Sequence, residues 1–330
     1  MKAVWYEKFG NADEVLMYGD FVTPEPKHGE VLVKLQASGI NPSDTKKRGG
    51  SNPALLDSGP VIPHSDGAGI IEAVGPGIPA SRVGEHVWIY NAQYDRQHGT
   101  AAEYVTLNSS QAVWMPESTG FEVGACLGIP AMTAHRCVTV NSPVDGRTIL
   151  VTGGAGRVGH YAVQWAKHLG ATVIATAGSE DSRKECTTAG ADLVTGHPGK
   201  EANEAIKDFT NGKGVDTIIE GEFGGNLASI LDVLKTNGSI VTYASGADPT
   251  PEIPFYRMMY LDITLSLVLV YVMPTQAKLK AAQDISEYLK QGKLLHRIVH
   301  TLPLSEIAEG HRLIEQGGFH GCVVLNCNEF

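Results

Sequence analysis

The sequence has few cysteines, no extended basic stretch and no long apolar run. Its five cysteines are scattered without a C-x-x-C pair, as is usual for reduced thiols in a cytoplasmic protein. The net charge of −10 favours binding to neither nucleic acid nor an anionic membrane. The N-terminus lacks the apolar segment of a secretory signal, and the longest apolar run, residues 263–273, is too short to cross a bilayer. We therefore expect a cytoplasmic protein without nucleic-acid or membrane partners, in which 263–273 form a buried strand.

The length and the pattern of elements predict two domains. A chain of 330 residues with 42% hydrophobic residues can bury two cores of ordinary size. Short strands separated by glycine and proline fill residues 1 to about 120, which is typical of a compact β-barrel. From about residue 125 strands alternate with helices, as in a doubly wound parallel sheet. Helices over 276–291 and 305–316 and a closing strand at 323–325 complete the chain.

A glycine-rich turn follows the apolar strand at 148–151 and opens a helix. Glycine allows the sharp bend and the close approach of a pyrophosphate, while the free amides at the helix start attract the phosphate charge. A second apolar strand, 172–177, completes β-α-β in about 30 residues, the context in which this motif binds dinucleotides. The alternative is a purely structural turn. The predicted phosphate-binding residues are Gly154, Ala155, Gly156, Arg157, Val158 and Gly159.

The end of that second strand bears on the choice of nucleotide. An acidic residue there would accept hydrogen bonds from the ribose of NAD and repel the 2′-phosphate of NADP. The chain has Gly178 and Ser179 instead, and Arg183 and Lys184 follow one helical turn later. We therefore expect NADP, although the neighbouring acids at 180 and 181 weaken the inference, and the two basic residues also fit a solvated helix face.

The order of these segments resembles the medium-chain dehydrogenase/reductase superfamily, and within it the zinc-free quinone oxidoreductase branch that includes zeta-crystallin. The resemblance rests on residues 38–44, 64–75 and 128–134 together with the nucleotide turn, and it covers nearly the whole chain. It implies a GroES-like β-barrel catalytic domain, residues 1–124 and 274–330, and a Rossmann NADPH-binding domain, residues 125–273. It also implies NADPH as hydride donor, an active site in a cleft between the domains, and a homodimer.

The same resemblance places further residues around the cofactor. Asn41 is expected beside the nicotinamide, where it orients the substrate or the cofactor ribose; the alternative is an Asn-Pro turn that satisfies its own backbone. His197 is expected beside the 2′-phosphate, unless it is a solvated loop histidine. The remaining cofactor-binding positions implied by the resemblance are Thr133, Gly178, Asn226, Ala244, Ser245, Val268, Leu269 and Val270.

No zinc site is expected. Catalytic zinc takes three side chains, mostly from cysteine, histidine and carboxylates. In the zinc-dependent relatives a cysteine lies in the segment that resembles 38–44, and a histidine stands where this chain has Ser65; both are missing here. His64, and His296 with His300, have no cysteine cluster beside them and are interpreted as structural or surface residues. We therefore predict a metal-free enzyme.

Without zinc to polarise a carbonyl, the hydride acceptor must already be electron-poor, such as a quinone or a conjugated carbonyl compound. Relatives often carry tyrosines in the segment just after Asn41, but this chain has Lys46 and Asn52 there. Lys46 is a candidate for stabilising an enolate or a carboxylate, or for contacting cofactor phosphate. Tyr90 is a candidate phenolic donor, with loop packing as its alternative.

The predicted function is zinc-independent, NADPH-dependent reduction of a quinone. The alternative within enzymes is an alkenal or enoyl reductase acting on conjugated double bonds. The alternative of another class is a non-catalytic, crystallin-like protein that only binds NADPH.

Overall fold

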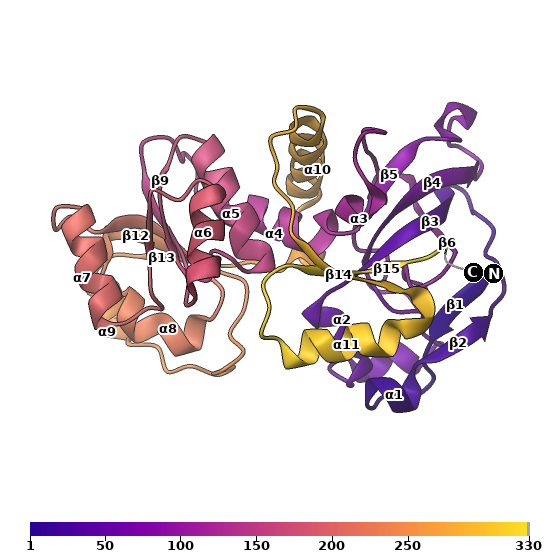
Figure 1. The fold of residues 1–330 in the computed structure, drawn as a ribbon, viewed down its shortest axis with the longest axis horizontal. Helices are drawn as coiled ribbons and strands as arrows, with labels where there is room; N and C mark the ends of the chain where they lie inside the picture. Colours follow the sequence, from indigo (N-terminus) through magenta and orange to yellow (C-terminus); the bar gives the residue numbers. More distant parts are fainter. Residues whose placement is uncertain (329–330) are drawn as a thin grey trace. The chain divides into compact units, whose positions relative to one another are not determined.

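The computed structural model describes residues 1–328, which form two compact units. One unit combines the residues up to 129 with those from 282 onward, and the other contains residues 130–281. The predicted α/β fold class is confirmed, because the second unit is built on a parallel sheet with helices on both faces (Figure 1). The first unit is built on a separate, mostly antiparallel sheet.

The parallel sheet has the strand order β10-β9-β8-β11-β12-β13. Numbered along the chain, this order is 3-2-1-4-5-6, the arrangement of a dinucleotide-binding fold, in which the ligand lies at the carboxyl ends of the strands where the order reverses. Here the reversal falls between β8 and β11. The strands are β8 (Thr148–Val151), β9 (Thr172–Thr176), β10 (Leu193–Thr195), β11 (Val215–Glu220), β12 (Leu234–Thr242) and β13 (Thr264–Leu267).

The apolar runs of the central strands form because both faces of the sheet are covered. Leu150, Ile174, Ile218 and Ile240, one from each of four neighbouring strands, belong to a single buried cluster. The elements of this unit besides the strands are α4 (Met132–Thr139), α5 (Arg157–His168), α6 (Glu180–Thr188), α7 (Lys200–Phe209), α8 (Phe223–Ile230), α9 (Phe255–Tyr260), the short turn Val270–Val272 and the first part of α10 (Thr275–Lys290).

The buried strand predicted over 263–273 is wrong. β13 is only four residues long and lies at the edge of the sheet, and a 3-10 turn follows it. The side chains of Leu267, Leu269 and Val272 are 77%, 54% and 61% exposed. An apolar run indicates burial only if both faces and both edges are covered, which the sequence pattern does not reveal.

The sheet of the other unit has the order β14-β15-β3-β4-β5-β7, with β6 paired to β3. Its strands are β3 (Glu30–Ile40), β4 (Asp66–Val74), β5 (His86–Ile89), β6 (Tyr104–Asn108), β7 (Ala112–Trp114), β14 (Ile298–Pro303) and β15 (Cys322–Asn326), and β1 (Lys2–Trp5) pairs separately with β2 (Met17–Asp20). Its α-helices are α1 (Ala12–Val15), α2 (Pro42–Arg48), α3 (Phe121–Gly124) and α11 (Ile307–Gln316). Short turns lie at Pro53–Leu56, Ala80–Arg82, Ser109–Gln111, Leu127–Ala131 and Leu304–Glu306.

The pairing of β3 with β4 positions the first candidate residue. Gly39 of β3 lies opposite Asp66, the first residue of β4. Asn41 comes two residues after Gly39 and begins α2, so it lies beside Asp66. α2 and α11 contact each other in this unit (Figure 1). Among residues 1–328, no helix is long and apolar enough to span a membrane.

Candidate functional site

The predicted phosphate-binding turn connects β8 to α5. Gly153 has φ 60°, a conformation that favours glycine, and its amide donates to Thr176 Oγ1 over 2.9 Å. Gly156 is the N-cap of α5. A Cβ on Gly159 would lie 2.2 Å from the carbonyl oxygen of Gly153, so only glycine lets the helix approach the turn this closely. The turn therefore presents a helix N-terminus at the edge where nucleotides bind in this kind of sheet.

Residues predicted to contact the 2′-phosphate gather after β9. A Cβ on Gly178 would lie 2.6 Å from His197 Nε2, so these two residues are in contact. The Arg183 Nε–H group donates to the carbonyl of Ala177 over 3.3 Å, and Arg183 Nη2 lies 3.7 Å from the Cβ position of Gly196. Arg183, from α6, and His197, from the segment after β10, therefore both lie near the end of β9.

The other two residues of that prediction have different roles in the structure. Ser179 is the N-cap of α6, and its Oγ accepts a hydrogen bond from the amide of Ser182 over 3.2 Å. Lys184 Nζ lies 3.3 Å from Glu180 and 4.0 Å from Asp181 on the exposed face of α6. This arrangement favours the solvated helix face that the sequence left open for Lys184.

A pocket of about 290 Å³ lies at the carboxyl ends of β12 and β13. Four of the residues expected to bind the cofactor line it: Ala244, Ser245, Val268 and Leu269. Val270 is buried immediately beyond, and Thr133 is buried within α4. Phe223, Thr242, Tyr243 and Leu267 complete the lining.

Glu220, at the end of β11, is a buried carboxyl that the sequence analysis did not single out. Its Oε1 accepts from Thr152 Oγ1 at 2.8 Å, from the amide of Glu222 at 2.6 Å and from Asn226 Nδ2 at 2.9 Å. Burial raises the pKa of this carboxyl despite these three donors. Asn226, expected to contact cofactor, thus also binds Glu220. The sequence signal that could have identified Glu220 is an acidic residue at the end of an apolar strand, next to the point where the strand order reverses.

In the other unit, Asn41 is held by the side chains of two aspartates. The amide of Asn41 donates to Asp44 Oδ2 over 2.8 Å as α2 begins, and its side-chain Nδ2 donates to Asp66 Oδ2, also over 2.8 Å. Asn41 and Asp66 are both buried. Asn41 is therefore the N-cap of a helix, and its side chain is fixed by a partner distant in the chain; its position beside the nicotinamide stays a prediction.

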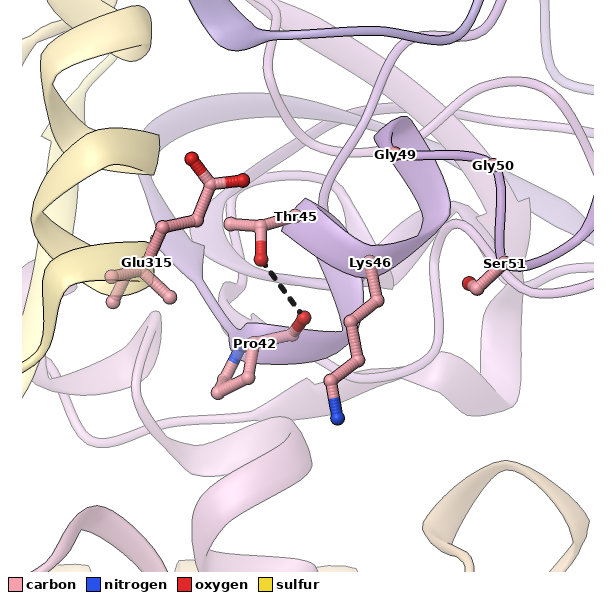
Figure 2. A pocket seen from close by; sticks show the side chains of 8 residues that line it. Pro42, Thr45, Lys46, Gly49, Gly50, Ser51 and Glu315 are labelled. Carbon is pink, nitrogen blue, oxygen red and sulfur yellow. Dashed lines mark hydrogen bonds between the residues drawn. The ribbon is translucent and has the colours of Figure 1, made fainter. Parts of the chain in front are cut away.

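Lys46 and Lys47 point in different directions. Lys46 is exposed and lines a pocket of about 670 Å³ between α2 and α11, together with Thr45, Ser51 and Glu315. Figure 2 shows its side chain extending from α2 with Nζ at the free end. Lys47 Nζ instead donates to the carbonyl of Gln93 over 2.9 Å, and burial lowers its pKa. The sequence alone does not show which of these adjacent lysines is exposed; their positions on different sides of α2 decide it.

Tyr90 lies in the core of its unit. Its ring centroid is 5.9 Å from that of Trp88, and burial raises the pKa of its phenol. Asn52, the residue after the pocket-lining Ser51, is exposed. The burial of Tyr90 favours the packing alternative over a phenolic proton donor.

His64 is part of a buried chain of hydrogen bonds whose direction can be deduced. Thr100 Oγ1 donates to the Asp66 carbonyl over 2.6 Å, so it must accept from Ser38 Oγ at 2.8 Å. Ser38 has then used its proton, and it accepts from His64 Nδ1 at 2.9 Å. The neutral His64 ring therefore accepts at Nε2 from His311 Nε2, 2.9 Å away.

The residues at the position of a zinc site do not fit the metal. The segment that carries a cysteine ligand in zinc-dependent relatives has Asn41, and Ser65 replaces the histidine. Lys47 Nζ lies 3.4 Å from Ser65 Oγ, so a positive charge already faces this hydroxyl. A second cation would be repelled there. Within residues 1–328, no group of three or more histidine, cysteine, aspartate or glutamate side chains could hold a metal ion.

A Rossmann unit and a second, mostly antiparallel unit in one chain are the architecture expected of a medium-chain dehydrogenase/reductase. Residues 27–117 match the alcohol dehydrogenase GroES-like domain, and residues 158–287 match the family described as zinc-binding dehydrogenase. Human quinone oxidoreductase is 32% identical over 329 residues, which cover 98% of this chain and 97% of the human protein. The chain therefore belongs to the quinone oxidoreductase family of this superfamily.

Two further relatives differ in what their names describe. The 2-methylene-furan-3-one reductase of tomato, Solanum lycopersicum, is 27% identical, and the match covers 99% of this chain and 79% of that protein. A mycobacterial structure solved in complex with NADPH is 29% identical, with a TM-score of 0.86 and coverage of 99% of this chain and 100% of the other.

Proposed function

We propose that the protein transfers a hydride from NADPH to a quinone or another electron-poor conjugated carbonyl compound without a metal ion. The observation that carries the cofactor choice is the group formed by Gly178, Arg183 and His197 after β9. Two donors of hydrogen bonds stand where an acid would exclude a 2′-phosphate. The mycobacterial relative that binds NADPH supports the same assignment.

The chemistry follows from what the chain provides. Hydride transfer without a Lewis acid requires an acceptor whose own conjugation stabilises the negative charge that develops on oxygen. Asn41 is the proposed residue beside the nicotinamide, and its amide can donate to or accept from the cofactor ribose or the acceptor. Lys46, whose ammonium is free at the pocket of α2 and α11, favours acceptors that carry or develop negative charge there (Figure 2).

A second candidate function is reduction of a conjugated carbon-carbon double bond. It is favoured by the replacement of the aromatic residues expected for stacking a flat quinone with Lys46 and Asn52. The tomato relative, whose name describes a reductase of a methylene-furanone, supports it as well. The non-catalytic alternative predicts NADPH binding without turnover of any acceptor.

The test is oxidation of NADPH by metal-stripped protein against 9,10-phenanthrenequinone, 1,4-benzoquinone and a series of conjugated alkenals and enoyl thioesters, repeated with NADH. We expect turnover with NADPH, and the preferred acceptor decides between the two enzyme functions. NADPH binding without any turnover would leave only the non-catalytic function, and loss of turnover on metal removal that zinc restores would contradict the metal-free mechanism.

We also propose that the protein is a cytoplasmic homodimer. All five cysteines are buried thiols outside any disulfide bond, as in a reducing compartment. The outer side of β13 has no partner strand among the described residues, and the apolar side chains of Leu267 in β13 and of nearby Leu269 are exposed. An apolar strand edge of this kind is suited to pairing with a second copy. Analytical ultracentrifugation should show a dimer for wild type and a monomer for Leu267→Lys. A monomeric wild-type protein would refute the proposal.

A further inference from the structure

We propose that Asp66 is a positioning residue that fixes the side-chain amide of Asn41 in one orientation for the hydride transfer proposed above. The inference rests on that proposed function for the role of Asn41. Asp66 Oδ2 accepts from Asn41 Nδ2 and from the amide of Ile129, each over 2.8 Å, and Asp66 is 0% exposed. A residue at the start of β4 thus binds the N-cap of α2 and the segment Leu127–Ala131 with one oxygen atom.

The orientation of Asn41 follows from the chemistry of its neighbour. Asp66 Oδ2 receives the Ile129 N–H group, and Asn41 Nδ2 is the atom that lies 2.8 Å from the same oxygen, so Oδ2 also accepts from Asn41. The NH₂ group of Asn41 must therefore face Asp66, and its carbonyl oxygen must face away. A flipped amide would bring two oxygen atoms to hydrogen-bonding distance and lose the bond. The backbone of Asn41 is fixed separately by Asp44.

The surroundings of Asp66 hold the carboxyl group in place. A Cβ on Gly128 would lie 2.0 Å from Asp66 Oδ1, so glycine is needed for the turn to pass this closely. The carbonyl of Asp66 accepts from Thr100 Oγ1 over 2.6 Å, at the end of the hydrogen-bond chain that starts at His311. Backbone and side chain of Asp66 are both anchored, as expected of a group that orients another.

The protonation of Asp66 sharpens the test. Burial raises the pKa of Asp66 to about 8, and the neighbouring Asp44 raises it further. The amide of Ile129, Asn41 and the ammonium of Lys47 act in the opposite direction. At neutral pH the carboxyl is therefore mainly protonated. Because Oδ2 accepts two N–H groups, the proton belongs on Oδ1, which has no hydrogen-bond partner among the described residues.

This arrangement makes Asp66→Asn a close mimic of the neutral residue. The asparagine oxygen can accept the same two N–H groups, and its NH₂ takes the position of the protonated oxygen. Asp66→Leu has similar volume and no acceptor. A matched control is Asp216→Asn, because Asp216 also accepts a backbone amide, that of Thr148 over 2.8 Å, in a position remote in the chain from Asn41.

Single-turnover hydride transfer from NADPH at pH 6.5 should be within about threefold of wild type for Asp66→Asn and Asp216→Asn. It should fall about 10-fold to 100-fold for Asp66→Leu, as expected when the acceptor of a buried N–H group is removed. NADPH affinity should not change. Wild-type transfer rates in Asp66→Leu would overturn the proposal, as would equal losses in Asp66→Asn and Asp66→Leu.

A second measurement does not depend on turnover. In NMR spectra of protein labelled with ¹⁵N-asparagine, the signal of the Asn41 side-chain amide can be assigned by its loss in Asn41→Asp. The hydrogens of this amide should exchange with solvent slowly in wild type and in Asp66→Asn, and rapidly in Asp66→Leu. If wild type reduces no acceptor, the proposed enzyme function fails and this signal still decides the role of Asp66. Equal amide exchange in folded Asp66→Leu and wild type would show that Asp66 does not fix Asn41.

Discussion

The buried pair of His64 and His311 should make the protein sensitive to acid. Burial lowers the pKa of His64 to about 3, and the nearby charge of Lys47 contributes in the same direction. The pKa of His311 is also lowered well below its ordinary value, mainly by burial and by His64, while Asp44 raises it and Arg48 lowers it. His64 Nε2 already accepts from His311 Nε2, so a proton added to His64 would place two N–H groups against each other.

The sign and size of the effect follow from proton binding. An unfolded histidine binds a proton below pH ~6.5, whereas the folded His64 remains neutral until about pH 3. Stability is therefore fully present above pH ~6.5 and falls as the pH decreases toward 3. For His64 alone the loss is about 3 kcal/mol by pH ~4.5 and about 5 kcal/mol at most. Asp66, whose carboxyl pKa is raised, acts in the opposite sense and gains stability as the pH falls from 8 toward 4.

Comparison with His64→Asn isolates the histidine contribution. Asparagine tolerates the φ of 77° at this position and does not titrate. Urea unfolding should show the stability difference between wild type and this variant shrinking by about 3 kcal/mol from pH ~7 to pH ~4.5. His28→Asn, at an exposed histidine, serves as the control and should show no such change. A difference for His64→Asn that is the same at both pH values would refute the reasoning.

Three further predictions concern ligand binding. Gly156→Val adds bulk at the phosphate-binding turn, whose Cβ position is already 3.1 Å from the Gly153 carbonyl oxygen, and should weaken NADPH at least about 100-fold by calorimetry. Wild-type affinity would contradict the cofactor site. His197→Ala should weaken NADPH about tenfold and NADH less than about twofold; equal losses would remove His197 from the phosphate site. Lys46→Gln should raise KM up to about fivefold for a carboxylate-bearing quinone and leave 1,4-benzoquinone unchanged. Equal KM changes for both quinones would exclude charge recognition by Lys46.

The sequence predicted most of the regular structure. The apolar strands, the glycine turn and the helix spacing indicated the Rossmann unit, and the helices expected at 276–291 and 305–316 correspond to α10 and α11. These features depend on residues that are close together in the sequence, so the spacing of apolar residues and glycines is enough to predict them. The exception, β13, depends on what covers a sheet edge.

The contacts around the candidate site were less accessible to prediction. The bond from Asn41 to Asp66 and the pairing of His64 with His311 join residues distant in the chain. Nothing in the local pattern of Asp66 distinguishes a buried carboxyl from an exposed strand end. The different directions of Lys46 and Lys47 likewise depend on how α2 is seated against the sheet. Such features require the register of β3 and β4, which only the folded chain defines.

The order of strands β14-β15-β3 has a consequence for folding during synthesis. β15 pairs with residues 37–40 of β3, whereas residues 30–34 pair with β6, so the end of β3 next to Asn41 lacks one native partner strand until residues 322–326 have been synthesised. Residues 130–281 are continuous and can form their sheet before that point. The nucleotide-binding half thus matures first although it comes second in the sequence, and a chain stopped before residue 322 would retain it while leaving the half that contains Asn41 unfinished.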